Sequence, residues 1–274
     1  MMQSRTHNCN QLRIENVGEK VKLVGWMENV REVGGNLAFV VLRDFYGTTQ
    51  VVVEDEADLK VIKGINKEST ISVEGTVRER ASKNSKQATG EIEVLTDHAE
   101  VLNTSVTPPF QIEDGIETSE DTRLRYRYLD LRRPEMMANL KLRSDFTFAI
   151  REALHNREFM EVETPSLFKS TPEGARDYLV PSRVQPGHFY ALPQSPQLYK
   201  QILMLSGFDR YFQLAHCYRD EDLRADRQPE FTQVDEEMSF VSEDDIMTLN
   251  EGLIKRLWKE MLNVDVETPF YRMP

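Results

Sequence analysis

Residues 210–241 read RYFQLAHCYRDEDLRADRQPEFTQVDEEMSFV, and this stretch determines the fold that we expect for the second half of the chain. Two β-rich runs, Arg210 to Arg219 and Glu230 to Val241, flank a charged loop of residues 220–228. Strands that are joined by so short a loop normally pair with each other in the antiparallel sense. We therefore expect an antiparallel pair of strands here.

Helical patterns surround this pair of strands. Apolar residues recur at three- and four-residue steps after Pro134 and predict a long amphipathic helix over 134–157. A second helix is expected over 195–205 and a last one over 242–262, where Ser242 is an N-cap residue followed by three acidic residues. Shorter strand-like runs cover 161–165, 177–184 and 188–192.

The first part of the chain is rich in β-branched residues. Five short strands are expected there, separated by glycine-containing turns, over residues 21–26, 37–42, 49–53, 70–77 and 90–95. One helical pattern, residues 56–65, falls between the third and fourth strands. This element order is typical of the OB-fold barrel, which often binds single-stranded nucleic acid.

A change of pattern separates the two parts. Residues 103–122 lose periodicity and contain Pro108, Pro109 and Gly115, so we place a domain boundary near residues 105–120. Residues 123–133 follow, with five arginines interleaved with two tyrosines. This run fits either a hinge tied by salt bridges to the acidic second domain or a patch that faces RNA.

Composition excludes several classes of protein. The 274 residues carry a formal charge of −12, and no apolar run approaches the roughly 18 residues of a membrane span. No secretory leader is recognised at the start of the chain. The two cysteines, Cys9 and Cys217, lie far apart, with no partners at metal-ligand spacing. We expect a cytoplasmic protein with no disulfide, no zinc site and no membrane partner.

Three segments contain charged and aromatic residues of the kinds found in binding and catalytic sites. In the loop after Arg219, an arginine, nearby carboxylates and Phe231 could bind phosphate, an amine and a base, although a solvated hairpin tip has the same composition. Gln197 and Lys200 share one face of the helix over 195–205, where a lysine is ordinarily solvated. Glu173 lies in a loop that could be a plain surface loop or a mobile cover over a bound amine.

These segments together resemble a known family. Four stretches, residues 163–165, 171–183, 194–200 and 218–235, resemble the class II aminoacyl-tRNA synthetases, and within them the bacterial-type aspartyl branch. The resemblance spans essentially the whole chain. It implies an α+β protein with an OB-fold anticodon-binding domain over 1–105, a linker or hinge over 106–133, and the N-terminal part of a class II catalytic domain over 134–274.

The resemblance also implies an activity: ATP-dependent activation of L-aspartate to aspartyl-adenylate, followed by transfer to the 3′ end of tRNA(Asp). It places ATP, with Mg²⁺ as its cation, against Arg219, Asp220, Glu221, Gln228 and Phe231. Arg219 and Glu221 would be the catalytic residues, with Arg219 on the α-phosphate and on the substrate carboxylate. No metal ligand can be assigned from the sequence.

In the same family, Lys200 would pair with the side-chain carboxylate of aspartate and Glu173 would contact its ammonium group. The whole aspartate pocket implied by the resemblance comprises Glu173, Ser195, Gln197, Leu198, Tyr199, Lys200, Arg219, Gln233 and Asp235. The anticodon would contact Arg31, Phe39, Gln50, Arg78 and Glu93.

The long helix and the strand ending at Pro165 would form a homodimer interface. The family's third class motif has no counterpart among the 274 residues, so we expect an N-terminal part of a longer enzyme that is inactive alone. Two alternatives remain open. One is a non-catalytic tRNA-binding or dimerisation module, and the other is an asparaginyl-type relative.

Overall fold

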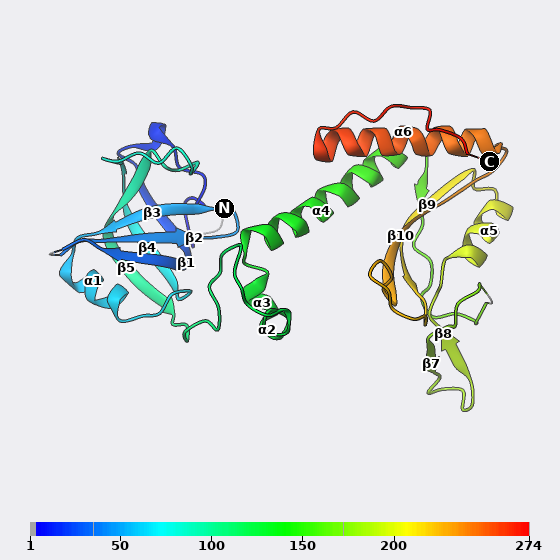
Figure 1. Ribbon diagram of the computed structural model, residues 1–274, viewed down its shortest axis with the longest axis horizontal. Coiled ribbons are helices and arrows are strands. Elements are labelled where there is room, and N and C mark those ends of the chain that lie inside the picture. Colours follow the sequence, from blue (N-terminus) through cyan, green and yellow to red (C-terminus); the bar gives the residue numbers. More distant parts are fainter. Residues whose placement is uncertain (1–3, 35, 172, 274) are drawn as a thin grey trace. The chain divides into compact units, whose positions relative to one another are not determined.

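The chain folds as two compact units, Met1–Arg133 and Pro134–Pro274 (Figure 1). The computed structural model describes residues 4–34, 36–171 and 173–273. Within these residues, no helix combines the length and the apolar character that crossing a membrane requires.

A closed five-stranded barrel forms most of the first unit, as the sequence predicts. Its strands follow the order β1-β2-β3-β5-β4, and only β3 and β5 are parallel neighbours. The strands are β1 (Lys20–Glu32), β2 (Ala38–Arg43), β3 (Thr48–Val53), β4 (Thr70–Glu79) and β5 (Ile92–Asn103). This topology confirms the OB-type architecture.

Alternating burial explains why these residues form a barrel. Leu23, Val40 and Val77 are buried in its core, while their chain neighbours are more exposed, as strands covered on one face require. At Gly75 a β-carbon would lie only 2.2 Å from the carbonyl oxygen of Leu95, so the close approach of β4 and β5 there requires glycine.

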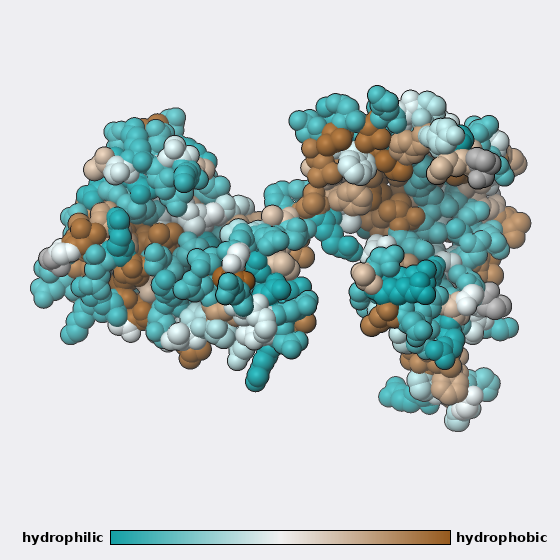
Figure 2. All heavy atoms as spheres, viewed as in Figure 1, coloured by the Kyte–Doolittle hydropathy of each residue, from teal (hydrophilic) through white to brown (hydrophobic). Residues whose placement is uncertain are grey.

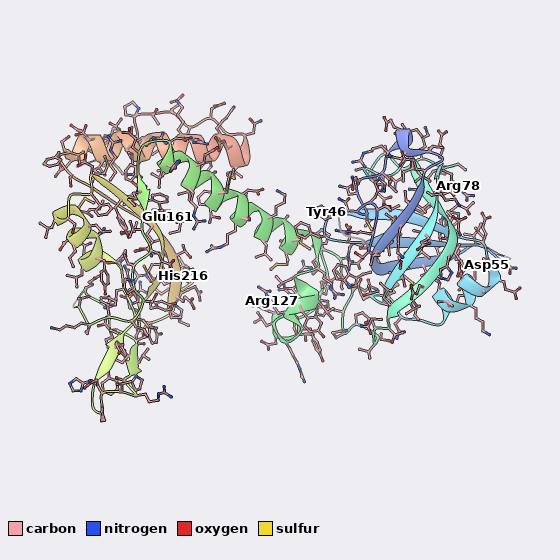
Figure 3. The ribbon with its side chains drawn as sticks, turned by 180° about the vertical axis from the view of Figure 1, so that it is seen from behind. Tyr46, Asp55, Arg78, Arg127, Glu161 and His216 are labelled. Carbon is pink, nitrogen blue, oxygen red and sulfur yellow. The ribbon has the colours of Figure 1, made fainter. Side chains whose placement is uncertain are left out.

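The helix α1 (Glu56–Lys63) lies between β3 and β4, as predicted. The carboxylate of its N-cap residue Asp55, labelled in Figure 3, accepts hydrogen bonds from the N–H groups of Ala57 and Asp58. A short 3₁₀ helix, η1 (Ile14–Asn16), precedes the barrel.

Two short helices, α2 (Glu120–Arg125) and α3 (Arg127–Asp130), occupy the arginine-rich segment. The carboxylate of Asp130 is fully buried, and it lies 2.5 Å from Arg127 and 3.0 Å from Arg133. Arg132 contacts Glu68 of the barrel unit at 2.8 Å. Arg127, Arg132 and Arg133 thus form ion pairs with carboxylates of their own unit, and residues 106–133 belong to the first compact unit.

The second unit is built on the predicted hairpin. Strands β9 (Arg210–Tyr218) and β10 (Glu230–Met238) pair antiparallel along their full length, which confirms the prediction, and β6 (Met160–Glu161) adds a parallel edge. The other elements are α4 (Pro134–His155), β7 (Leu179–Pro181), β8 (Phe189–Ala191), α5 (Gln197–Leu205) and α6 (Glu243–Leu262). The strand-like runs at 161–165, 177–184 and 188–192 are shorter than predicted, since regular pairing covers only part of each.

The two long helices cover the sheet unequally. Ile150 and Leu154 of α4 are buried against Leu253 and Leu257 of α6 and against Phe212. The part of α4 before Ala149 leaves large apolar side chains exposed, namely Leu140, Leu142, Phe146 and Phe148. Figure 2 shows hydrophobic side chains gathered where α4 and α6 meet. At the start of α6, Ser242 and Asp245 form the predicted cap as a reciprocal capping box.

Candidate functional site

The loop after β9 brings a cation against an aromatic ring. The N–H of Arg219 donates to the carbonyl of Pro229 at 2.9 Å, which fixes the start of the loop. Phe231 lies opposite Cys217 in the strand register, so its ring stands next to the end of β9. The Arg219 guanidinium carbon lies 5.1 Å from the centroid of the Phe231 ring. A guanidinium on the face of an aromatic ring can bind a phosphate while the ring binds a base.

These two residues line a pocket of about 540 Å³ at the tip of the hairpin. Glu221 and Gln228, also expected to bind ATP, line the same pocket. Asp220 lies beside it, where its N–H donates to the carbonyl of Arg176 at 3.0 Å. Loop residues Asp222 and Asp226 contribute further carboxylates to the pocket wall. Neither was predicted from the sequence as a site residue.

A second charged cluster lies further along β10. The Nζ of Lys200 lies 3.0 Å from a carboxylate oxygen of Asp235 and 3.2 Å from one of Glu237. Burial alone would lower the pKa of Lys200, but its interactions with Asp235 and Glu237 outweigh burial and raise that pKa. Burial raises the pKa of Asp235, although Lys200 opposes this rise. The Oδ2 atom of Asp235 is buried and has no hydrogen-bond partner among the described residues.

One face of β10 connects the two clusters. Phe231, Gln233 and Asp235 alternate with more exposed residues and therefore project to the same side of the strand. Four residues of strand span about 13 Å. The cation–aromatic pair and the lysine–carboxylate cluster thus stand at opposite ends of one continuous face.

The loop residues 173–177 are attached to the start of α5. Ser195 donates a hydrogen bond of 2.6 Å to the carboxylate of Glu173. The buried amide of Gln194 accepts from the N–H of Ala175 at 3.2 Å and donates to its carbonyl at 2.9 Å. The sequence reading missed Gln194 as a site residue, although it directly precedes Ser195. Gln194 holds the loop so that Glu173 stays near α5.

Other predicted residues stand apart from these clusters. Leu198 is largely exposed, and the ring of Tyr199 packs against Phe168 with 5.7 Å between centroids. Among the described residues, no hydrogen bond joins the side chain of Gln197 to Lys200. The thiol of Cys217 donates to the Oε1 of Gln233 at 3.3 Å, and burial raises the pKa of Cys217 to about 11.

A separate cavity of about 620 Å³ lies along β6 and β9 and includes Glu161 and His216, both labelled in Figure 3. Arg151 and Glu163 also line it, and Arg151 pairs with Glu161 at 3.0 Å. None of the residues predicted for ATP or aspartate lines this cavity.

All five residues predicted to contact RNA lie on one face of the barrel. Arg31 and Phe39 are direct cross-strand partners, with the guanidinium carbon 5.1 Å from the ring centroid. Glu93 is buried and accepts from Gln50 at 2.7 Å and from Arg78 at 2.8 Å. Arg78 is labelled in Figure 3. Charged and amide groups are therefore held in fixed positions beside an aromatic platform.

A pocket of about 280 Å³ opens on this face, lined by Arg31, Phe39 and Gln50. Arg80 donates to the Oε1 of Gln50 at 2.7 Å and lines the pocket too. The sequence reading missed Arg80 and three amide residues of the lining: Asn29, Asn84 and Gln87. Arg80, Asn84 and Gln87 lie between β4 and β5. In that region the sequence has no periodicity that would predict to which side of the barrel a side chain projects.

Comparison with known proteins matches both units. The family described as tRNA synthetases class II (D, K and N) matches residues 119–274, more than half of the chain. The chain belongs to this family. Residues 21–102 of this class II synthetase chain also match the OB-fold nucleic acid binding domain of the anticodon-binding type.

Individual relatives agree with this assignment. The chain is 55% identical over 98% of its length to an aspartate–tRNA ligase of Bacteroides fragilis, and 54% identical to an aspartate–tRNA(Asp/Asn) ligase of Desulfatibacillum aliphaticivorans. It covers 46% of each, so the chain spans about half the length of the curated relatives it matches. A crystal structure of Pyrococcus horikoshii asparaginyl-tRNA synthetase with asparaginyl-adenylate superposes with a TM-score of 0.82, at 28% identity, over 96% of this chain and 59% of that one.

Proposed function

We propose that the protein acts as an aspartate–tRNA ligase of the cytoplasm, which activates L-aspartate with ATP and transfers it to tRNA(Asp). The continuous face of β10 carries this proposal. It has a site for a nucleotide at Phe231 and Arg219, and a site for a charged amino acid at Asp235 and Lys200. The separation of about 13 Å suits one extended molecule that combines both parts, as an aminoacyl-adenylate does.

The proposed roles at the nucleotide end follow from the contacts. The Phe231 ring stacks on adenine, and Arg219 neutralises the α-phosphate and the attacking carboxylate. Gln228, Asp220 and Glu221 hold the rest of ATP around the pocket. An α-carboxylate attacks the α-phosphorus and pyrophosphate leaves, so the site must bring two anions together and stabilise the developing charge.

The amino-acid end suits aspartate. Lys200 offers a cation to the side-chain carboxylate, while Asp235 and Glu173 offer acceptors to the ammonium group. The buried Oδ2 of Asp235, which accepts no hydrogen bond from the described part of the chain, supports this assignment, because an ammonium donor would satisfy it. Ser195, which orients Glu173, and Gln233 complete the proposed pocket.

Mg²⁺ accompanies ATP in this proposal. In the described part of the chain, no three His, Cys, Asp or Glu side chains come together in a group that could hold a metal ion. Mg²⁺ is usually bound by one or two carboxylates together with substrate phosphates. Glu221 at the pocket is the carboxylate we propose for this purpose, and no chemical step here is routed through the metal.

Exchange of pyrophosphate into ATP tests the proposed activity without tRNA. We expect the full-length protein to catalyse exchange with L-aspartate and not with L-asparagine, because Lys200 favours a carboxylate over a neutral amide. Exchange with asparagine alone would support the asparaginyl-type alternative. Tight tRNA binding without exchange for either amino acid would support the non-catalytic module.

We also propose that the barrel binds the tRNA anticodon, with Phe39 as a stacking platform. Phe39→Ala should weaken binding of an anticodon hairpin of tRNA(Asp) by about 1–3 kcal/mol, the usual contribution of a base–aromatic stack. Titration at fixed salt measures this, since phosphate contacts depend on ionic strength. Val33→Ala, a change at an exposed residue outside the pocket, provides the control. Equal affinities for wild type and Phe39→Ala would remove Phe39 from the site.

A homodimer formed through 134–165 is proposed as well. Leu140 and Phe148 lie on one side of α4, two turns apart, with exposed fractions of 49% and 69%. Replacing both with aspartate should weaken association by about 1.5–3 kcal/mol for each apolar side chain. Sedimentation of the full-length protein measures the change, with Asn156→Asp beyond the end of α4 as the matched control. Identical dimerisation of both variants would contradict this interface.

A further inference from the structure

A second cavity adjoins the anticodon pocket of the barrel. It has a volume of about 540 Å³, and it shares Asn29, Val41 and Gln87 with the smaller pocket that contains Phe39. The three shared residues form the boundary between the two spaces. A polynucleotide that enters one pocket is therefore adjacent to the other.

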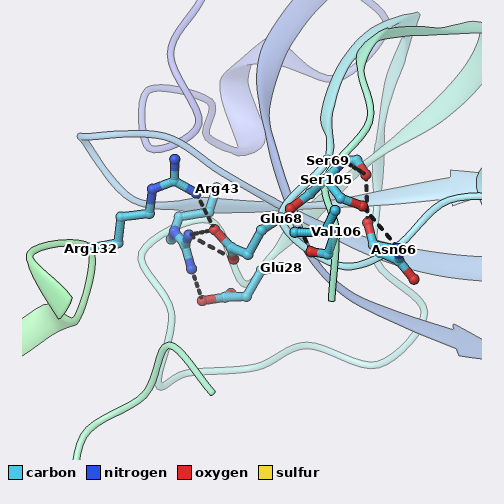
Figure 4. A network of polar contacts seen from close by, with 8 residues as sticks. All are labelled: Glu28, Arg43, Asn66, Glu68, Ser69, Ser105, Val106 and Arg132. Carbon is cyan, nitrogen blue, oxygen red and sulfur yellow. Dashed lines mark hydrogen bonds and ion pairs between the residues drawn. The ribbon is translucent and has the colours of Figure 1, made fainter. Parts of the chain in front are cut away.

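The outer wall of this cavity is a preformed part of the linker. The side-chain amide of Asn66 donates to the carbonyl of Ser105 at 2.9 Å, and the N–H of Ser105 donates to the hydroxyl of Ser69 at 3.0 Å (Figure 4). Phe110 is buried, and Arg133 donates to the carbonyl of Glu113 at 3.1 Å. These contacts hold the linker in place over the barrel.

Two of the three carboxylates that line the cavity, those of Glu28 and Glu68, are neutralised by arginines, and the third, Glu113, is exposed at its edge. Arg43 contacts Glu28 at 3.0 Å and Glu68 at 2.7 Å, and Glu68 also accepts from Arg132 at 2.8 Å (Figure 4). The Arg132 guanidinium carbon lies 4.5 Å from the ring centroid of Trp26. Glu28 and Glu68 would otherwise repel a polyanion, but each is paired with an arginine.

The remaining lining groups suit a nucleobase. Lys67 and Gln111 are exposed and, among the described residues, form no side-chain hydrogen bond or ion pair. Amide side chains can both donate to and accept from base edges, a lysine can contact the adjoining phosphate, and Phe110 supplies apolar surface.

We propose that this cavity binds the unstacked base of the nucleotide that flanks the anticodon, next to the bases bound at Phe39. The inference rests on the proposed anticodon function of the barrel and adds a base site to it. The barrel face then reads a longer single-stranded segment than the Phe39 pocket alone accommodates.

Abasic RNA hairpins test this second site. The probes are the anticodon hairpin of tRNA(Asp) and two versions that lack the base directly 5′ or directly 3′ of the anticodon. One abasic hairpin should bind wild-type protein about 5- to 150-fold more weakly than the intact hairpin, as expected for loss of one bound base. The double variant Lys67→Ala/Gln111→Ala should bind the intact and that abasic hairpin with nearly equal affinity.

A control variant and the Phe39→Ala variant distinguish the second base site from the anticodon function of the barrel. Lys60 is an exposed residue of α1 that does not line the cavity. The Lys60→Ala variant loses one positive charge, as Lys67→Ala does, and should retain the wild-type preference for the intact hairpin. Wild-type protein that binds all three hairpins equally, while Phe39→Ala still loses affinity, would overturn the second site and leave the anticodon function standing. Failure of wild-type protein to bind any hairpin would overturn both.

Discussion

Arg219→Ala in the full-length protein is expected to lower aspartate-dependent pyrophosphate exchange by about a hundred- to a thousandfold, which corresponds to about 2.7–4 kcal/mol. The reason is the position of the guanidinium, 5.1 Å above the Phe231 ring at the end of β9, where the α-phosphate of ATP is proposed to bind. Charge develops at that phosphate in the transition state. A cation that is already fixed in place stabilises this developing charge without having to reorient. Water molecules would have to reorient, so they cannot replace the guanidinium.

Two further variants make this test specific. Arg224→Ala removes the same charge from the same loop, but Arg224 is exposed and does not line the pocket, so its exchange rate should remain close to wild type. Arg219→Lys keeps the charge and loses bidentate geometry, and we expect an intermediate rate. An Arg219→Ala enzyme as active as the Arg224→Ala enzyme would contradict the proposed role.

The local elements of the fold could be predicted from the sequence because their signals are local. Alternation along residues 21–26 and 70–77 indicated strands that the barrel contains, and Ser242 indicated the start of α6, where a capping box forms. The pairing of β9 with β10 followed from one short loop. In each case the physical cause acts within a few residues of the pattern that revealed it.

The helices and ion pairs of the arginine-rich segment over 123–133 could not be predicted in the same way. The run over 123–133 showed many arginines but not their partners, and the barrel partner of Arg132 is Glu68, 64 residues earlier in the chain. Asp130 organises several of these arginines from a fully buried position, which composition does not reveal. Such pairs depend on tertiary packing.

In the candidate site, too, some residues could be predicted from the sequence and others could not. The residues around Arg219 and Phe231 were recognisable because one hairpin carries them all. Gln194, which holds the loop at Ala175, and Glu237, the second partner of Lys200, were missed. Glu237 lies two residues after Asp235 on the same face of β10, so the period of two could have indicated it.

The buried pairing of Glu68 leads to the second prediction of large effect. Its side chain is only 4% exposed, accepts two hydrogen bonds from Arg43 at 2.7 and 2.8 Å, and accepts one more from Arg132. Its backbone has a φ of 68°, a left-handed conformation that glutamine tolerates about as well as glutamate. Glu68→Gln therefore changes the charge without adding a new backbone cost.

We expect Glu68→Gln to lower the free energy of unfolding of the first unit by about 3–5 kcal/mol, because it removes the buried carboxylate shared by Arg43 and Arg132 and leaves Glu28 as the one remaining counter-charge that the described contacts give these two guanidinium groups. Urea unfolding followed by the fluorescence of Trp26 measures this, since Trp26 lies against Arg132, and a Trp258→Phe background removes the other tryptophan. Glu74→Gln makes the same chemical change in an exposed pair with Lys22 and should leave the free energy of unfolding close to that of the wild type, because solvent screens exposed pairs. If both variants unfold at the same urea concentration, the Glu68 network does not stabilise the barrel. If only Glu68→Gln is destabilised, the Arg43–Glu68–Arg132 network stabilises the first unit.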